Sequence, residues 1–168
     1  QLHGSETADD IENIKQKFNT KIIKAIKISE REDFEEVSKF DKVADFLLFD
    51  AAAPANTAHS LPGGNGISFN WNWLSNASLA TPWFLSGGLN ISNINEAVRT
   101  TGATAVDVSS GVEDKAGIKN NQKIIEFMNR LEHYRIAKNS IFLISFWYLH
   151  FHPLAQESGC PTKKLQIH

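Results

Sequence analysis

Cysteine is almost absent from the chain, and this absence narrows both its fold class and its chemistry. Of the 168 residues only Cys160 is a cysteine. A single thiol excludes a disulfide scaffold and a zinc site built from thiolates, and it is typical of a reducing compartment. We therefore expect a cytoplasmic globular protein.

The chain also lacks a charge imbalance and a long apolar segment. The 17 Lys and Arg nearly balance the 19 Asp and Glu, so the basic surface of a nucleic-acid-binding protein is not expected. The longest apolar run, residues 141–151, is about half the roughly 20 residues of a membrane-spanning helix. The opening QLHGSETADD has no signal-peptide pattern and no Met, as expected of a processed chain or a fragment. We expect a single domain with no nucleic-acid or membrane partner.

Apolar runs and amphipathic segments alternate along residues 1–134. Strands are predicted at 21–29, 43–50, 82–86 and 104–109, with the remnant of another at 1–3. A helix is predicted after each of them: from Thr7 and Asp10, from the capping-box pattern of Ser29 and Glu32, around Trp71 and Leu74, between Ser92 and Gly102, and over 120–134. Such alternation with nearly continuous apolar strands is typical of a parallel sheet covered by helices.

Five predicted strands leave two parallel architectures open. A closed (β/α)8 barrel needs eight strands and at least about 200 residues, whereas an open doubly wound sheet is compatible with five. Residues 135–168 continue neither pattern, and we interpret them as an atypical tail that contains an apolar run.

Polar residues and glycines follow the predicted strands, where parallel α/β folds collect their functional groups. They are His3-Gly4, Asp50, Ser86-Gly87-Gly88 and Ser109-Ser110-Gly111. Glycine lets backbone N–H groups approach an anion, so such loops at helix N-termini bind phosphate. Each loop alone is better explained by a tight turn, whereas two successive loops favour a phosphate site.

Asp50 ends the apolar strand VADFLLFD. Burial at such an edge raises the pKa of a carboxyl, which suits a general acid, and a loop or helix cap explains the residue equally well. The loop at 63–71 lacks the Lys-[Ser/Thr] of a nucleotide P-loop, so it is either a lid or a turn.

Histidines and tryptophans offer weaker signals. His150 and His152 have no third ligand nearby in sequence, so no metal site is predicted. Trp71, Trp73 and Trp83 are expected to pack between helix and sheet rather than to line an aromatic pocket.

Five segments together resemble the phosphoribosylanthranilate isomerase family of tryptophan biosynthesis. They are QLHGSE at 1–6, LLFD at 47–50, PGGNGISFNW at 62–71, LSGGLN at 85–90 and VDVSSGVED at 106–114. Their order and spacing are similar to the fourth to eighth strands of that family. The resemblance therefore implies an α/β fold over residues 1–134 that is a partial (β/α)8 TIM barrel without its first three βα units.

The resemblance also implies an activity and a set of site residues. The family carries out an Amadori rearrangement of a small phosphorylated sugar-anthranilate without a cofactor. Asp50 matches its general acid, and Gly87, Gly88, Ser110 and Gly111 match its phosphate-binding loops. His3, Asp107 and Gly64 match substrate-binding positions at the mouth of the barrel.

Several departures from the family pattern limit the expected activity. The cysteine base of the first strand and the arginine of the third are absent, Cys160 lies in no matching motif, and Asn65 and Asn70 replace the usual residues. We expect a chain that is inactive alone and self-associates through open sheet edges at Leu2 and Val106. The alternatives are a non-catalytic remnant or phosphate-binding half-barrel, and another phosphosugar barrel enzyme.

Overall fold

A parallel sheet with helices between its strands forms the centre of the protein. The computed structural model describes residues 1–51, 68–75, 77–138 and 143–145. The elements are α1 (Ala8–Phe18), β1 (Ile23–Ile28), η1 (Arg31–Glu35), α2 (Val37–Phe40), β2 (Phe46–Ala51), η2 (Trp71–Trp73), β3 (Trp83–Leu85), α3 (Ile94–Thr101), β4 (Ala105–Asp107), η3 (Ser110–Val112), β5 (Glu113–Lys115), β6 (Ile118–Lys119), α4 (Asn121–Lys138) and β7 (Leu143–Ser145).

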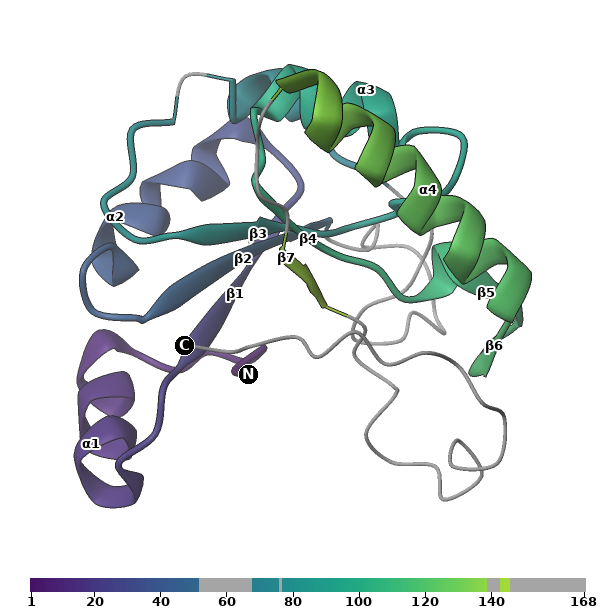
Figure 1. The fold of residues 1–168 in the computed structure, drawn as a ribbon. Helices are drawn as coiled ribbons and strands as arrows, with labels where there is room; N and C mark the ends of the chain where they lie inside the picture. The colour runs from purple at the N-terminus through teal and green to yellow at the C-terminus, as the bar shows by residue number, and fades with distance from the viewer. Residues whose placement is uncertain (52–67, 76, 139–142, 146–168) are drawn as a thin grey trace.

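The sheet runs in the order β1-β2-β3-β4-β7, and every pair of neighbours is parallel. Helices α2, α3 and α4 cover one face, and α1 lies beside β1 (Figure 1). Ile11 of α1 belongs to the same hydrophobic cluster as the residues under the other helices. A doubly wound sheet has a reversal of strand order and helices on both faces, and this sheet shows neither. Of the two architectures left open by the sequence, the structure favours the barrel-like one.

The two faces of the sheet carry different side chains. Alternate residues such as Ile26, Leu47, Phe49 and Leu85 pack under the helices in the large core cluster. The residues between them point to the inner face, where Ala25, Leu48, Phe84 and Ala105 form a separate layer. Inward-facing side chains stacked in layers are typical of barrel strands.

Local sequence signals explain several element boundaries. The Thr7 side chain accepts a hydrogen bond from the Asp10 amide, and Asp10 accepts one from the Thr7 amide, so the predicted capping box starts α1. Gly102, with φ of 70°, ends α3 in the left-handed conformation. The indole rings of Trp73 and Trp83 pack edge-on against Phe34 and Phe49, which confirms the predicted packing role.

Some predicted boundaries were wrong by a residue or more. The second capping box joins Glu30 and Asp33 rather than Ser29 and Glu32, because the Asp33 carboxylate accepts from the amides of both Ser29 and Glu30. The helix that follows is divided into η1 and α2. Asn93 rather than Ser92 precedes α3.

The largest differences between the predicted and the observed structure lie at the two edges of the sheet. Residues 1–3, predicted as the remnant of a strand, form a single parallel bridge from Leu2 to Lys24 of β1. The fifth strand is β7, which lies in the segment expected to be a tail, and α4 continues to Lys138 past the expected boundary at 134. Val106 pairs with Ile144 of β7, so the expected open edge at β4 is covered.

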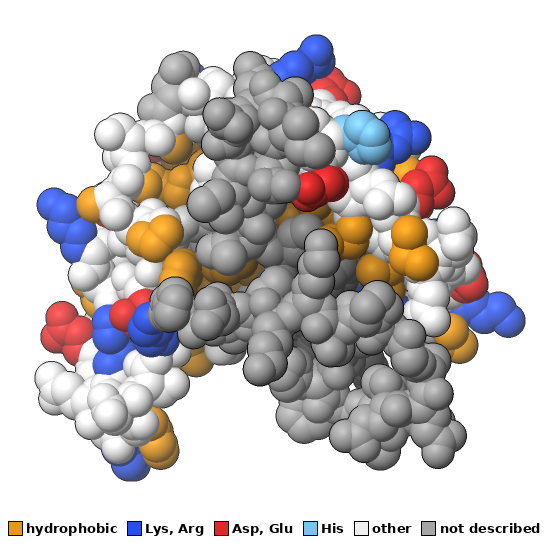
Figure 2. All heavy atoms as spheres, in the orientation of Figure 1, with side chains coloured by type: hydrophobic (Ala, Val, Ile, Leu, Met, Phe, Trp, Pro, Cys, Tyr) orange, Lys and Arg blue, Asp and Glu red, His pale blue; other side chains and the backbone are white. Residues whose placement is uncertain are grey.

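The surface distribution of side chains agrees with this layering. In the view of Figure 2 most charged side chains lie toward the outline, and hydrophobic side chains gather nearer the middle. Within the described ranges, no helix has the length and apolarity that a membrane crossing requires. In the same part of the chain, no group of three or more His, Cys, Asp or Glu is arranged to hold a metal ion.

Candidate active site

A row of polar residues crosses the inner face at the carboxyl ends of the strands. Lys27 of β1 is in register with Asp50 of β2. The register of β2 with β3 pairs Leu48 with Phe84, which places Ser86 beside Asp50, and the pairing of Leu85 with Val106 places Asp107 beside Ser86. The row lies directly above the layer of Ala25, Leu48, Phe84 and Ala105. Its four members are Lys27, Asp50, Ser86 and Asp107.

Asp50 is the buried acid of this row. Only 7% of the residue is exposed, and burial raises the pKa of its carboxyl. The Ala51 amide, the Lys27 charge and the Ser86 hydroxyl act in the opposite direction without cancelling the effect of burial. A carboxyl with a raised pKa holds its proton closer to neutral pH, as a general acid requires.

Ser86 lies between two buried carboxyl groups. Its hydroxyl donates to the Asp107 carboxylate at 3.5 Å and also interacts with Asp50. Both Ser86 and Asp107 are buried, at 9% and 7% exposed. The serine thus connects the predicted acid with the second predicted carboxylate. The sequence indicated Ser86 only as the first residue of a glycine loop, because its link to the two carboxyl groups depends on strand register.

The two glycine loops lie against each other at the same edge. Gly87 and Gly88 both have positive φ, at 84° and 64°, and a Cβ on Gly87 would lie 2.4 Å from the Ala51 amide nitrogen. A Cβ on Gly111 would lie 1.8 Å from the carbonyl oxygen of Leu89, in the first loop. Glycine is therefore required for this close approach, and both loops adjoin the end of the polar row.

The glycine loops leave backbone donors available. The Gly88 carbonyl accepts from the side-chain amides of Asn90 and Asn93, which fixes the first loop. No acceptor among the described residues is bonded to the amides of Gly87, Gly88, Ser110 or Gly111. Adjacent unpaired N–H groups of this kind form anion-binding concavities.

A short antiparallel hairpin supports the second loop. Lys119 of β6 donates to Glu113 at 2.5 Å and to the Ser109 hydroxyl at 2.9 Å. Burial acts to raise the pKa of Glu113, but the bonds from Lys119 and the Gly117 amide lower it overall. The hairpin of β5 and β6 was not predicted, and its ion pair holds Ser109 beside the loop.

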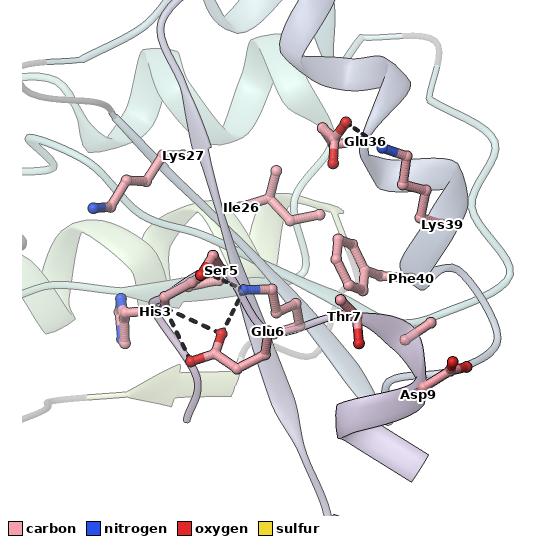
Figure 3. Close-up of a pocket in the computed structure, with 14 residues that line it drawn as sticks. His3, Ser5, Glu6, Thr7, Asp9, Ile26, Lys27, Glu36, Lys39 and Phe40 are labelled. Atoms are coloured by element: carbon pink, nitrogen blue, oxygen red, sulfur yellow. Dashed lines mark hydrogen bonds and ion pairs between the residues drawn. The ribbon is translucent and has the colours of Figure 1, made fainter. Parts of the chain in front are cut away.

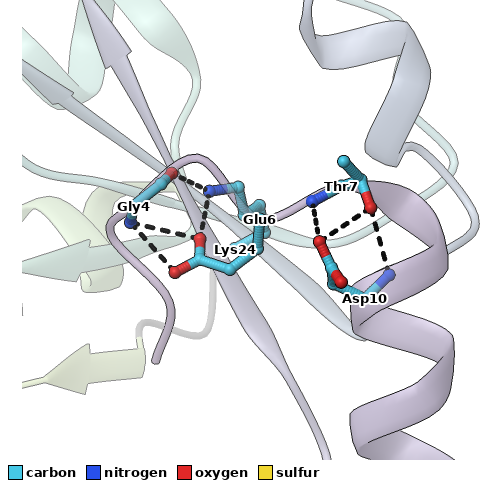
Figure 4. Close-up of polar contacts among 5 residues, drawn as sticks. All are labelled: Gly4, Glu6, Thr7, Asp10 and Lys24. Atoms are coloured by element: carbon cyan, nitrogen blue, oxygen red, sulfur yellow. Dashed lines mark hydrogen bonds and ion pairs between the residues drawn. The ribbon is translucent and has the colours of Figure 1, made fainter.

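An ion pair anchors the loop that carries His3. Lys24 donates to Glu6 at 2.8 Å and to the Gly4 carbonyl at 2.7 Å, and the Gly4 amide donates back to Glu6 (Figure 4). Lys24 points to the helix-covered face, where its ammonium lies 5.4 Å from the centre of the Phe40 ring. These contacts tie residues 4–6 to β1 and so position His3 next to the sheet.

His3 projects to the opposite side of β1 from Phe40, on the same side as Lys27 (Figure 3). Burial lowers the pKa of His3, and the positive charges of the N-terminus, Lys27 and Lys24 lower it further. The imidazole is thus favoured in its neutral form. The pocket in Figure 3 runs from His3 along β1 to Lys39 and Phe40.

Not every predicted residue falls within the described part of the chain. Gly64 and Asn65 of the glycine-rich loop, and also His150, His152 and Cys160, lie outside the described residues. Of the predicted site residues, the structure brings together Asp50, Asp107 and the two glycine loops. His3 lies beside β1 on the side away from β2, next to Leu2, which bridges to Lys24. Lys27 carried no sequence signal, because its place in the row depends on the pairing of β1 with β2.

A sequential parallel sheet, with helices on one face and polar groups at its carboxyl edge, defines a TIM-barrel-like α/β protein. The family profile for N-(5'-phosphoribosyl)anthranilate (PRA) isomerase matches residues 1–130. The chain therefore belongs to this isomerase family.

Individual relatives agree with the family assignment. The isomerase of Rhodospirillum centenum is 47% identical over 128 residues, which are 76% of this chain and 59% of that protein. The isomerase of Parvibaculum lavamentivorans is 46% identical over 128 residues, which are 76% of this chain and 60% of that protein. The chain thus spans about three fifths of the length of the curated relatives it matches.

Solved structures of the family have the same fold. The isomerase of Thermotoga maritima superposes with a TM-score of 0.65 at 28% identity, covering 79% of this chain and 60% of that one. Another isomerase structure, in complex with reduced 1-(o-carboxyphenylamino)-1-deoxyribulose 5-phosphate, gives a TM-score of 0.60 at 27% identity and covers 79% of this chain and 58% of that one.

Proposed function

We propose that this chain corresponds to strands four to eight of the isomerase barrel, with the first three βα units not included in it. The partial coverage of the relatives and the sequential order of β1 to β4 support this assignment. In this assignment Leu2 and His3 occupy the place of the fourth barrel strand, and β1 to β4 are the fifth to the eighth strands.

We further propose that the site serves an Amadori rearrangement of N-(5'-phosphoribosyl)anthranilate, in the soluble cytoplasm and without a cofactor. The reaction opens the ribose ring, so a proton must reach the ring oxygen as the bond from that oxygen to the first sugar carbon breaks. The second sugar carbon then loses a proton to a base, which gives an enolamine. Protonation of the first sugar carbon, with loss of the proton from the hydroxyl on the second, converts the enolamine into the ketose. Asp50 is the acid for the first step.

The observation that carries this proposal is the position of one buried acid beside two anion-binding loops. Gly87 packs against Ala51, the residue that follows Asp50, so the first glycine loop lies next to the acid. A phosphate on Gly87, Gly88, Ser110 and Gly111 would place the attached ribose toward the polar row. Asp107, bonded to Ser86, and His3 would then contact the sugar from either side of Asp50.

The isolated chain supplies an acid and a phosphate site but no cysteine base on a first strand. We therefore expect turnover that is absent or weaker by orders of magnitude than in the complete family. A second candidate function is a phosphate-binding half-barrel without catalysis. It is favoured by the amides of the two loops, which have no acceptor among the residues that the structure describes.

Amide NMR of the whole chain tests the proposal. Inorganic phosphate and the reduced carboxyphenylamino-deoxyribulose phosphate are each titrated into the 15N-labelled protein. The amides of Gly87, Gly88, Ser110 and Gly111 are expected to shift with both ligands. Shifts with phosphate alone would favour the half-barrel, and no shift with either would refute the phosphate site.

Two glycine variants sharpen the titration. Gly111→Ala forces a Cβ against the Leu89 carbonyl at 1.8 Å, so the loops must separate and phosphate binding is expected to be lost. Gly102→Ala is the matched control, because Gly102 ends α3 away from the two loops and its Cβ would meet nothing within 4 Å. Its positive φ of 70° costs stability only. Equal binding by both variants would contradict the proposed site.

A further inference from the structure

Ser86 places one hydroxyl between two buried carboxyl groups that stand on different strands. The hydroxyl donates to the Asp107 carboxylate of β4 at 3.5 Å, and on its other side it interacts with Asp50 of β2. All three residues are buried, so contact with bulk water is small and they depend on one another for hydrogen bonds. In such a cluster each hydrogen bond polarises the next, so the direction of the hydroxyl affects both carboxyl groups.

The hydroxyl of Ser86 cannot donate to both carboxyl groups at the same time. A serine hydroxyl carries one proton and two acceptor lone pairs. While it donates to Asp107, it contacts Asp50 only as an acceptor, and the partner that suits an acceptor is a protonated carboxyl. An ionised Asp50 requires the hydroxyl to turn away from Asp107. The single hydroxyl proton therefore links the protonation of Asp50 to the carboxylate of Asp107.

Charged groups face this cluster from both sides. Lys27 of β1 is in register with Asp50, but burial outweighs the Lys27 charge, and the pKa of Asp50 stays raised. His3 lies on the same side as Lys27 and is favoured as the neutral imidazole. On the other side the carboxylate of Asp107 stands beyond Ser86. A protonated Asp50 beside an ionised Asp107 is thus the arrangement in which the hydroxyl serves both groups.

We propose that Ser86 is a positioning residue for the acid: its hydroxyl donates to Asp107 while Asp50 holds its proton, and it turns to Asp50 once that proton has been transferred. This inference rests on the proposed function, in which Asp50 protonates the ring oxygen. In that step the O–H bond of the Asp50 carboxyl breaks and its electron pair stays on the carboxylate. The bond from the ring oxygen to the first sugar carbon breaks with its electrons on the protonated oxygen, and the lone pair of the substrate nitrogen forms a double bond to that carbon.

A hydroxyl that turns supports the acid in both of its states. It accepts from the carboxyl before the transfer and donates to the carboxylate that the transfer leaves behind. The second interaction is the stronger one, because a hydrogen bond to a charged group is roughly twice as strong as one between neutral groups. It therefore lowers the barrier more than it stabilises the resting state. Ser86 itself neither gains nor loses a proton.

A double-mutant cycle on the whole chain tests this coupling without substrate. The pKa of Asp50 is measured from the pH dependence of its side-chain carboxyl 13C signal, which Asp50→Asn identifies. Asp107→Asn removes the charged acceptor of the hydroxyl, which is then available to the Asp50 carboxylate, so the pKa of Asp50 should fall. In a Ser86→Ala background only the direct charge effect of Asp107→Asn remains. The fall there should be smaller by about one pH unit, which is the contribution of one hydrogen bond to a charged group.

Two further variants separate the hydroxyl from general packing effects. Ser86→Thr keeps a hydroxyl and should restore the wild-type fall. Ser38→Ala is the matched control, because the Ser38 hydroxyl on α2 donates to the Glu35 carbonyl rather than to a member of the row, and it should leave the effect of Asp107→Asn unchanged.

The outcomes distinguish the role of Ser86 from the role of the acid. Equal falls in the wild-type and Ser86→Ala backgrounds, or a Ser86→Thr background that behaves like Ser86→Ala, would overturn the role of Ser86 and leave the acid and the phosphate site intact. An Asp50 carboxyl that titrates at or below about pH 4 in the wild-type chain would instead overturn Asp50 as the acid, and the proposed function with it.

Discussion

The ion pair between Glu6 and Lys24 is expected to stabilise the protein in an asymmetric way. The Lys24 side chain is only 4% exposed, whereas the Glu6 side chain is 26% exposed. Removing the carboxylate leaves an ammonium that cannot reach water, and deleting one partner of a buried pair typically costs 3 to 5 kcal/mol. Because the Gly4 carbonyl still accepts from Lys24, we expect Glu6→Gln to lower the free energy of unfolding by about 2 to 3 kcal/mol.

The reverse substitution should be much milder. Lys24→Met removes the buried charge, keeps the packing against Phe40, and leaves Glu6 exposed enough to be hydrated. We expect a loss of about 1 kcal/mol or less, since apolar replacements of buried charges are often close to neutral. The exposed pair of Lys39 and Glu36, at 60% and 53% exposed, is the control, and Glu36→Gln should change stability by less than about 1 kcal/mol.

Urea unfolding followed by circular dichroism measures these differences, and pH provides a second check. The hydrogen bond from Lys24 lowers the pKa of Glu6 below its ordinary value. Its contribution is therefore present above the unfolded pKa of about 4.3 and is lost as the pH falls through the folded pKa. The stability gap between wild type and Glu6→Gln should close in acid. A Lys24→Met variant less stable than Glu6→Gln would refute the argument from Lys24 desolvation.

Three further predictions concern the acid, the first helix and the end of the chain. Asp50→Asn should be more stable than wild type above about pH 4, because the raised pKa of Asp50 makes its ionisation unfavourable in the folded state. The difference in stability should widen with rising pH until the pH passes the folded pKa of Asp50. Thermal unfolding at several pH values measures this difference, and a difference that narrows with rising pH would contradict the prediction. Thr7→Ala removes the cap of α1 and should cost about 1 kcal/mol by urea unfolding, whereas Thr7→Ser should cost little. A chain ending at Lys138 lacks β7 and exposes the edge of β4, so it should self-associate more than the full chain in size-exclusion chromatography; identical profiles would contradict a covering role for β7.

The sequence predicted the strands that are continuous apolar runs, because burial on both faces leaves no other pattern for them. β1, β3 and β4 lie within the predicted segments, and β2 extends one residue beyond its segment, to Ala51. β7 was missed because it occupies three residues within an apolar run that shows neither helical spacing nor alternation. The capping box at 29–33 was misplaced because two overlapping pairs share the same three-residue spacing, and the shorter Asp33 side chain makes the contact.

The site divides in the same way between local and long-range information. Asp50 and the glycine loops end their predicted strands, so single segments indicated them, whereas Asp107 was expected only from the resemblance to the family. The register of neighbouring strands decides which side chains stand beside Asp50. Ser86 and Lys27 lie 36 and 23 positions from Asp50 along the chain, and only the pairing of their strands with β2 brings them beside it. No periodicity within one segment reports such a pairing.

Two of the buried charged residues of the sheet, Lys24 and Asp50, differ in whether the fold supplies a partner for the charge. Lys24, under the helices, has a carboxylate and a carbonyl as partners, so its charge is accommodated and it serves the fold. Asp50, on the inner face, has no cation at ion-pair distance among the described residues, and burial keeps its pKa raised. An ionised carboxyl at this position destabilises the fold, and a fold selected only for stability would place an amide or an apolar residue there. Perturbed carboxyls of this kind cluster at functional sites, so the inner face is the side of the sheet at which chemistry is expected.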